Sequence, residues 1–209
     1  MKKKPVTTRI ILVRHGLTVM NIQGRINGHL HDRLAPKGRI QAEKVGKRLC
    51  KENIDKIYVS DLKRALETAK EISKHHKKIS IIKDKRLRER AFGMYDGELR
   101  SKFIDKLKSV NKKYLDFKPK GGESIIELKK RAQIIIDEII RSNSGKTILI
   151  ITHGTFIVST LLNLTKDANK NYLRYVHHNT GVSIVDITGK KVKLHTLNCT
   201  KHLNDELLS

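Results

Sequence analysis

The sequence predicts an α/β protein with three layers (α/β/α), in which helices cover both faces of a mostly parallel central sheet. Short apolar segments rich in β-branched residues alternate along the chain with longer segments of helical periodicity, which is typical of such sheets. Several apolar segments also end abruptly in polar residues and glycine, as expected where parallel strands reach the ligand-binding edge of a sheet. We expect a single domain over residues 1–209.

Each strand of this expected sheet is a short apolar segment. The first, residues 10–13, has no polar interruption and suits a strand that is buried on both faces. The segment at 147–151 is the most apolar of the chain. The remaining strands are expected at residues 56–59, 79–82, 181–187 and 191–198.

Helices are expected between these strands. One begins at Pro36 and presents an apolar face through Ala42, Val45 and Leu49. A second runs to about residue 75 and could be capped by either Ser60 or Asp61. Further helices are expected within 99–117, as one or two short helices, from the capping box of Ser124 and Glu127 to about 143, and from 155 to about 164.

Composition indicates a globular protein with a strongly basic balance. Of its 209 residues, 38% are apolar and 32% charged, and the formal net charge is +24. Such a charge allows polyanion binding, but the lysines are spread along the chain and aromatic residues make up only 4%, so we favour a compositional bias. Cys50 and Cys199 are isolated, which suits a reducing compartment, and no apolar run reaches membrane-spanning length. We therefore expect a cytoplasmic protein without a membrane partner.

Four chemically useful groups follow separate strands, each near the strand's carboxyl end. Arg14 and His15 follow the first strand, Arg64 the second, Glu89 the third, and His153 the most apolar one. Arginine can bind phosphate oxygens through two parallel hydrogen bonds, and histidine can act as a nucleophile or proton carrier near neutral pH. Because the carboxyl ends of parallel strands meet at one edge, these groups are expected to form an anion site.

The ordered motifs around these residues resemble the histidine phosphatase superfamily, or phosphoglycerate mutase-like family, over nearly the whole chain. The similarity is to its phosphatase branch. The motifs are Arg14-His15-Gly16 with Thr18 and Asn21, Gly24-Arg25 with Gly28, Gly38 with Gln41-Ala42, Ser60 to Ala69 around Arg64, Leu87 to Gly93 around Glu89, Gly121-Gly122-Glu123-Ser124, and Thr152-His153-Gly154. Leu17 departs from the usual glutamate or glutamine of the family, and Asn27 from a common glutamine.

The resemblance implies a metal-independent phosphomonoesterase that works through a phosphohistidine. In this scheme His15 is the nucleophile, Glu89 the proton donor and acceptor, and Arg14, Arg64 and His153 hold the phosphoryl oxygens. Further substrate contacts are expected from Asn21, Arg25, Asn27, Gly28 and Gly154. The resemblance also implies a small phosphorylated metabolite as substrate, no cofactor, a substrate-covering insertion at about 88–122, and a possible homodimer.

Three other functions stay open at this point. A phosphoglycerate mutase dependent on 2,3-bisphosphoglycerate would need a long lid between Glu89 and Gly121, which are close in sequence, although residues 89–93 are similar to the mutase's Glu-Arg-His-Tyr-Gly. A basic protein that binds nucleic acid or another polyanion on the same fold is the second alternative. A protein phosphatase with phosphopeptide substrates is a further option within the family.

Overall fold

A six-stranded, mostly parallel sheet forms the centre of the computed structural model, which describes residues 6–109, 115–167 and 169–208. Its strand order is β3 (Ile81–Lys83), β2 (Lys56–Val59), β4 (Thr147–Thr152), β1 (Thr7–Arg14), β5 (Val182–Thr188) and β6 (Lys191–Cys199). The first four strands of this order are parallel, whereas β5 and β6 pair antiparallel at one side. The predicted three-layer α/β fold is thereby confirmed.

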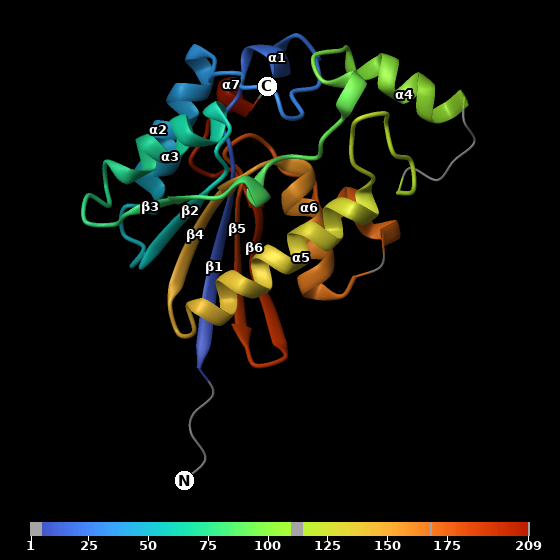
Figure 1. Cartoon of the computed structure of the whole chain (residues 1–209). Coiled ribbons are helices and arrows are strands. Elements are labelled where there is room, and N and C mark those ends of the chain that lie inside the picture. The colour runs from blue at the N-terminus through green and yellow to red at the C-terminus, as the bar shows by residue number, and fades with distance from the viewer. Residues whose placement is uncertain (1–5, 110–114, 168, 209) are drawn as a thin grey trace.

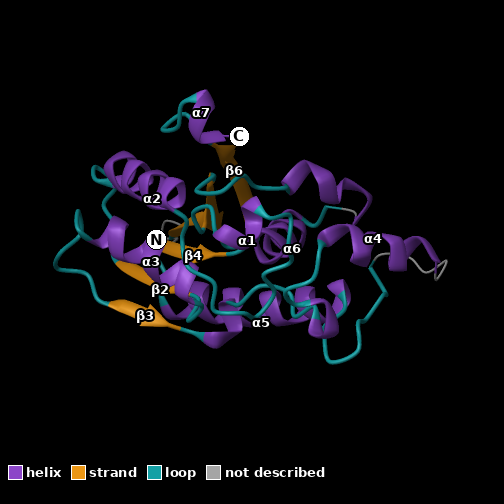
Figure 2. Cartoon of the chain, turned by 90° about the horizontal axis from the view of Figure 1, so that it is seen from above, coloured by secondary structure: helices purple, strands orange, loops and turns teal. Residues whose placement is uncertain are grey.

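Helices cover both faces of the sheet and bury two separate apolar cores. One face packs against α2 (Pro36–Leu49) and α3 (Lys63–Ser73), and the other against α5 (Ile125–Ser142) and α6 (Gly154–Thr165) (Figure 2). Side chains of β1 alternate between the two cores, since Ile10 and Leu12 enter one and Ile11 and Val13 the other. This burial on both faces explains the continuous apolar run of the strand.

Short helices and loops lie over the carboxyl end of the parallel strands. Figure 1 shows α1 (Val19–Ile22), α4 (Arg100–Ser109) and α7 (Asp205–Leu208) at this end of the molecule. Short 3-10 helices, η1 (Lys85–Leu87), η2 (Gly93–Tyr95) and η3 (Asn169–Tyr175), complete the connections. A third cluster is largely aromatic and contains Phe103 of α4 together with Phe92, Tyr95 and Phe117. The sheet therefore supplies a rigid edge, and these segments enclose the space above it.

Some expected element boundaries are wrong. Helix α3 begins at Lys63 with Leu62 as its N-cap and no side-chain cap, so neither Ser60 nor Asp61 caps it. The Ser60 hydroxyl accepts from the amide of Leu62, which precedes the first helical residue, at 3.4 Å, and it lies 2.8 Å from His153 Nε2. The Asp61 carboxylate accepts from Arg88. β3 lies two residues later than expected at its start, at Ile81.

Other features of the sequence analysis agree with the structure or extend it. The capping box of Ser124 and Glu127 is present at the start of α5. α1 was not expected, although Thr18 and Asn21 form a reciprocal capping box for its single turn. Within 99–117 the structure has α4, and residues 110–114 lie outside the described part of the chain.

Two glycines allow the end of β1 to approach α2 closely. A Cβ on Gly16 would lie 2.5 Å from the Gly38 carbonyl oxygen, and one on Gly38 would lie 1.9 Å from the Leu17 carbonyl oxygen. Both contacts are with backbone and cannot be relieved by a side-chain rotation. The residues that follow β1 are therefore fixed in place by backbone packing.

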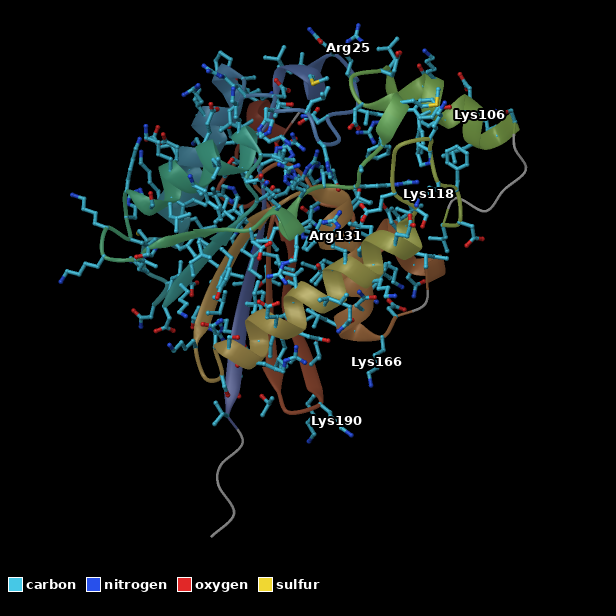
Figure 3. The ribbon with its side chains drawn as sticks, viewed as in Figure 1. Arg25, Lys106, Lys118, Arg131, Lys166 and Lys190 are labelled. Atoms are coloured by element: carbon cyan, nitrogen blue, oxygen red, sulfur yellow. The ribbon has the colours of Figure 1, made fainter. Side chains whose placement is uncertain are left out.

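Basic side chains are distributed over the molecule. In Figure 3, Arg25 and Lys106 lie at the end that holds α1 and α4, whereas Lys190 lies at the other end of the molecule. That the net charge of +24 reflects a compositional bias stays a prediction. Among the described residues, no helix combines the length and apolar character needed to cross a membrane.

Candidate active site

The two histidines expected at the site follow neighbouring strands. β1 and β4 are parallel partners, and Arg14 pairs with Thr152 in their register. The next residue on each strand is a histidine, and the ring centroids of His15 and His153 are 5.1 Å apart. The His15 amide donates to the Thr152 carbonyl at 3.0 Å, which extends the pairing into the site. The register of the sheet thus places both rings at one edge.

His15 is held with one ring nitrogen available for chemistry. Its side chain is only 3% exposed, and Nδ1 donates to the Gly16 carbonyl oxygen at 2.8 Å. Because a carbonyl can only accept, the proton of the neutral ring resides on Nδ1 and Nε2 keeps its lone pair. Burial, with smaller contributions from Arg64 and Arg14, holds the pKa of His15 well below 6.5. At neutral pH His15 is therefore uncharged, and its Nε2 lone pair is available.

Two guanidinium groups lie close to His15, that of fully buried Arg64 and that of partly buried Arg14. Arg64 is fully buried and donates to the carbonyl oxygens of Leu30 at 2.7 Å and Gly28 at 2.8 Å, while Arg14 donates to the His177 carbonyl at 2.5 Å. Burial lowers the pKa of each arginine to about 10, so both remain charged at neutral pH. Within the described chain, both Nε atoms are buried without a hydrogen-bond partner. Two cations, each with a buried and unpaired Nε donor among the described residues, constitute a strong site for an anion.

His153 provides a third polar group at this point. Its Nε2 lies 2.8 Å from the Ser60 hydroxyl oxygen. Among the described residues Nδ1 has no partner, although it is fully buried. Burial, together with nearby Arg64, also holds the pKa of His153 well below 6.5. If Ser60 donates to Nε2, the proton of the neutral ring lies on Nδ1, where it can be donated to an anionic oxygen.

Glu89 lies at the amino end of α6. Its carboxylate accepts hydrogen bonds from the backbone amides of Arg90 at 2.8 Å, Thr155 at 3.1 Å and Phe156 at 3.2 Å. Its backbone carbonyl accepts from His29 Nε2 at 2.9 Å and from Arg131 at 3.1 Å. Glu89, Arg14 and Gly154 line the same cavity of about 630 Å³. The carboxyl group is thus fixed beside the anion site.

The other expected substrate-binding residues lie in the loop around α1 and bind mainly to one another. Asn27 is buried and donates to the Thr18 hydroxyl at 2.8 Å, and the Asn21 amide nitrogen lies 3.5 Å from the Asn27 side-chain oxygen. Arg25 donates to the Gly97 carbonyl at 2.8 Å, away from the His15 group. Gly28 has φ +44°, and a Cβ there would overlap the Asp96 carboxylate. This loop therefore holds the Gly28 carbonyl that Arg64 contacts.

Three contributing residues were not assigned from the sequence. Ser60 contacts His153, His29 contacts the Glu89 backbone, and Arg131 of α5 donates to the carbonyls of residues 86, 88 and 89. Ser60 carried a signal, because it follows a strand at the same edge, but it was interpreted as a helix cap. No periodicity or spacing identifies Arg131, which reaches this backbone from a helix distant in sequence.

The arrangement contains anion-binding groups and no metal-binding cluster within the described ranges. No group of three or more histidine, cysteine, aspartate or glutamate side chains is placed there to hold a metal ion. The positive charge of the site is supplied by Arg14 and Arg64. A neutral histidine with an available ring nitrogen, two cations, a second histidine and a carboxyl group are groups that can carry out phosphoryl transfer.

Residues 10–200 match the family model of the histidine phosphatase superfamily (branch 1). The chain belongs to this family. It is 39% identical over 158 residues to phosphoglycerate mutase-like protein 4 of Arabidopsis thaliana, covering 72% of this chain and 68% of that protein. It is also 29% identical over 210 residues to a metal-independent phosphoserine phosphatase of the same plant, covering 98% and 87%.

Solved structures of histidine phosphatases have the same fold. Bacillus stearothermophilus YhfR is 27% identical, with a TM-score of 0.86 over 94% of this chain and 100% of the other. A phosphoserine phosphatase from Entamoeba histolytica, solved with phosphoserine, is 29% identical, with a TM-score of 0.83 over 94% and 100%. The predicted family, its phosphoglycerate mutase-like fold and the predicted phosphomonoesterase class are confirmed by these similarities.

Proposed function

We propose that this histidine phosphatase hydrolyses the phosphate monoester of a small metabolite in two steps, through a phosphohistidine at His15 and without a metal ion. The observation that supports this most directly is the available Nε2 of a neutral His15 beside the guanidinium groups of Arg14 and Arg64, whose Nε atoms are buried and unpaired within the described chain. The named relative that is a metal-independent phosphatase supports the absence of a metal requirement.

In the first step, the Nε2 lone pair attacks phosphorus in line with the bond to the leaving oxygen. The N–P bond forms, the P–O bond breaks, and the Glu89 carboxyl gives its proton to the leaving oxygen. Arg14, Arg64 and the Nδ1–H of His153 donate to the three remaining phosphoryl oxygens. The products of this step are the free alcohol, phospho-His15 and ionised Glu89.

In the second step, water attacks the phosphorus of phospho-His15. Glu89 takes a proton from the water, the O–P bond forms, and the N–P bond breaks, which returns the lone pair to Nε2. The products are inorganic phosphate, neutral His15 and protonated Glu89, so the site is restored. The backbone amides that bind the Glu89 carboxylate hold it in reach of both the leaving oxygen and the water.

The remaining predicted residues have supporting roles in this proposal. The segment at about 88–122 would cover the substrate, since Phe92 and α4 lie beside the cavity that Glu89 lines. Asn27 and Gly28 hold the loop that contacts Arg64, and the Gly154 backbone lies against Arg14. Asn21 and Arg25 take part through that loop rather than through a direct contact with the phosphate.

The test is hydrolysis of p-nitrophenyl phosphate in excess EDTA, with the wild-type protein and His15→Ala. A parallel assay follows 3-phosphoglycerate with a trace of 2,3-bisphosphoglycerate. Denaturation in alkali during turnover preserves phosphohistidine, which mass spectrometry of the His15 peptide then detects.

We expect the wild type to release phosphate in EDTA and to carry the modification on His15. Loss of activity on chelation would contradict metal independence, and activity retained by His15→Ala would contradict the assigned nucleophile. Isomerisation of 3-phosphoglycerate much faster than phosphate release would make the protein a mutase.

A further inference from the structure

A cavity of about 630 Å³ opens directly beside the reacting groups, and it is largely apolar. Its lining includes Arg14 and Glu89 at one point and continues along Phe92 and the α4 residues Phe103, Ile104 and Leu107. Val158 of α6 and Leu173 of η3 contribute further apolar surface. This volume suits a ligand of moderate size, and such a lining favours apolar groups of a ligand over charged groups.

The position of Glu89 determines which part of a substrate enters the cavity. The leaving oxygen must lie within hydrogen-bond reach of the Glu89 carboxyl group. The phosphoryl group itself is directed towards His15 and the buried guanidinium groups. The carbon atoms attached to the leaving oxygen therefore occupy the space next to Glu89, which is this cavity.

Charge in the lining argues against an anionic substrate tail. Apart from Arg14, which is committed to the phosphoryl group, the described lining contains one arginine or lysine, Arg100, and it is exposed. Attraction between an exposed guanidinium and a carboxylate is screened by water and contributes little. The lysines of α4, such as Lys102 and Lys106, are exposed and lie outside the lining. Among the described residues, no buried cation other than the committed Arg14 is placed to replace the hydration that a carboxylate would lose in this cavity.

Exposed apolar side chains also line the cavity, alongside the exposed Arg100. Leu173 is 82% exposed and Ile104 is 41% exposed, although both are large aliphatic side chains. Exposed apolar surface that continues into a reaction centre indicates a binding surface for an apolar group. Phe92 and Phe103, whose ring centroids are 5.2 Å apart, add an aromatic wall to this surface.

We propose that this cavity binds the carbon skeleton of the substrate, and that the preferred substrates are phosphate monoesters of apolar, uncharged alcohols. The proposal rests on the phosphatase function proposed above, and it assigns the substrate class. Each methylene buried in the cavity contributes to binding as long as apolar wall remains to be contacted. Phosphorylated amino acids and hydroxy acids gain no comparable binding free energy in this cavity, because their charged groups cannot be buried there.

The experiment measures kcat/KM for ethyl, butyl and hexyl phosphate in excess EDTA, by release of inorganic phosphate. These esters share a primary alkoxide leaving group, so their intrinsic reactivities are similar and differences report on binding of the chain. O-phosphoserine and 3-phosphoglycerate are the charged comparisons. We expect kcat/KM to rise about 3- to 4-fold per added methylene, or roughly 10²-fold from ethyl to hexyl. Both charged esters should fall far below hexyl phosphate.

A pair of variants assigns the effect to the cavity. Ile104→Lys places a cation at the mouth, and it should lower the hexyl-to-ethyl ratio about tenfold while raising the relative rate with 3-phosphoglycerate. Ile134→Lys is the matched control, because Ile134 lies on α5, is 53% exposed and does not line the cavity. The control should leave the hexyl-to-ethyl ratio unchanged.

The outcomes separate this proposal from the proposed function. If p-nitrophenyl phosphate is hydrolysed through His15 but the alkyl series is flat, or phosphoserine is preferred, the phosphatase function stands and the substrate class is wrong. If no ester is hydrolysed, both fail. A flat series combined with a dimer that Ile104→Lys dissociates would assign the apolar surface to a second copy of the chain and overturn the proposal.

Discussion

The two ends of the site are built on different principles. At the phosphoryl end, polar groups follow strands or begin a helix, are buried, and are held by backbone contacts, as for His15 with Gly16 and Arg64 with Leu30. At the leaving-group end, apolar side chains come from α4 and η3, and several of them are exposed. One end is fixed by the sheet, whereas the other is formed by connecting segments.

In the proposed function, this difference separates the chemistry at the phosphoryl end from the substrate specificity at the other end. Groups that stabilise a transition state must be held in place before the reaction, and the edge of a parallel sheet provides that rigidity. Apolar contacts are less directional, so a surface built from short helices can recognise a substrate without the same precision. Changes at the phosphoryl end should therefore alter the rate with every ester, and changes at the other end should alter the choice among esters.

The largest effect is expected for His15→Ala. Removing the nucleophile should lower kcat by about 10⁴-fold or more, because the residues of such a site act as a unit. The loss should be the same for ethyl and hexyl phosphate. His75→Ala, which removes an exposed histidine, is the control and should retain full kcat. A loss confined to one ester would show that the two ends are not separable.

Arg64→Lys should have the next largest effect. Lysine keeps a positive charge but cannot reproduce the hydrogen bonds to the carbonyls of Leu30 and Gly28 together with a donor for phosphate. We expect kcat/KM to fall by about 10²- to 10³-fold for all esters. Arg141→Lys, at an exposed position of α5, serves as the control and should behave as the wild type. A kcat/KM of Arg64→Lys within about threefold of the wild type would contradict the assigned role of the Arg64 guanidinium group in binding phosphate.

The buried histidines should make stability depend on pH. Burial lowers the pKa of His177 to about 4, so the folded protein binds fewer protons than the unfolded chain between pH 6.5 and 4. The stabilisation from neutral His177 is complete above pH 6.5 and decreases as the pH falls to 4. The full difference is about 3 kcal/mol, at about 1.4 kcal/mol for each unit of pKa shift. Urea unfolding at pH 7.5, 6 and 5 measures it, and His177→Gln should decrease the slope. An identical slope in the variant would contradict the assignment.

The phosphoryl end could be predicted from the sequence because each of its groups follows a strand. Arg14, His15 and His153 stand at the point where an apolar run ends, and the parallel arrangement then requires them to meet. The register that pairs Arg14 with Thr152 was not predictable, yet any parallel pairing of these strands would bring the histidines to one edge. Periodicity was sufficient here because the strands are buried on both faces.

The apolar cavity could not be predicted in the same way. Its walls come from α4, α6 and η3, which are distant in sequence, and α4 has only one buried side chain, Phe103. Weak periodicity in such a helix does not reveal what it faces, because tertiary contacts decide this. Ser60 shows a related difficulty. A serine after a strand is a good helix cap in isolation, and the sequence does not show that the fold brings His153 to 2.8 Å from its hydroxyl.

Among the variants at the phosphoryl end, Ser60→Ala should have the smallest effect on activity, and it should change the tautomer of His153. Without the hydroxyl at Nε2, nothing selects the His153 tautomer that carries its proton on Nδ1, the nitrogen left free for phosphate. We expect kcat to fall about tenfold with little change in KM, because the lost donor acts mainly on the charge that develops during transfer. Ser60→Thr retains a hydroxyl and should recover most of the activity.

Nitrogen-15 spectra of His153 should show a proton on Nδ1 in the wild type and a mixture of tautomers in Ser60→Ala. Spectra that are identical in both proteins would mean that Ser60 only packs beside the ring, and the rigidity of the phosphoryl end would then depend on backbone contacts alone.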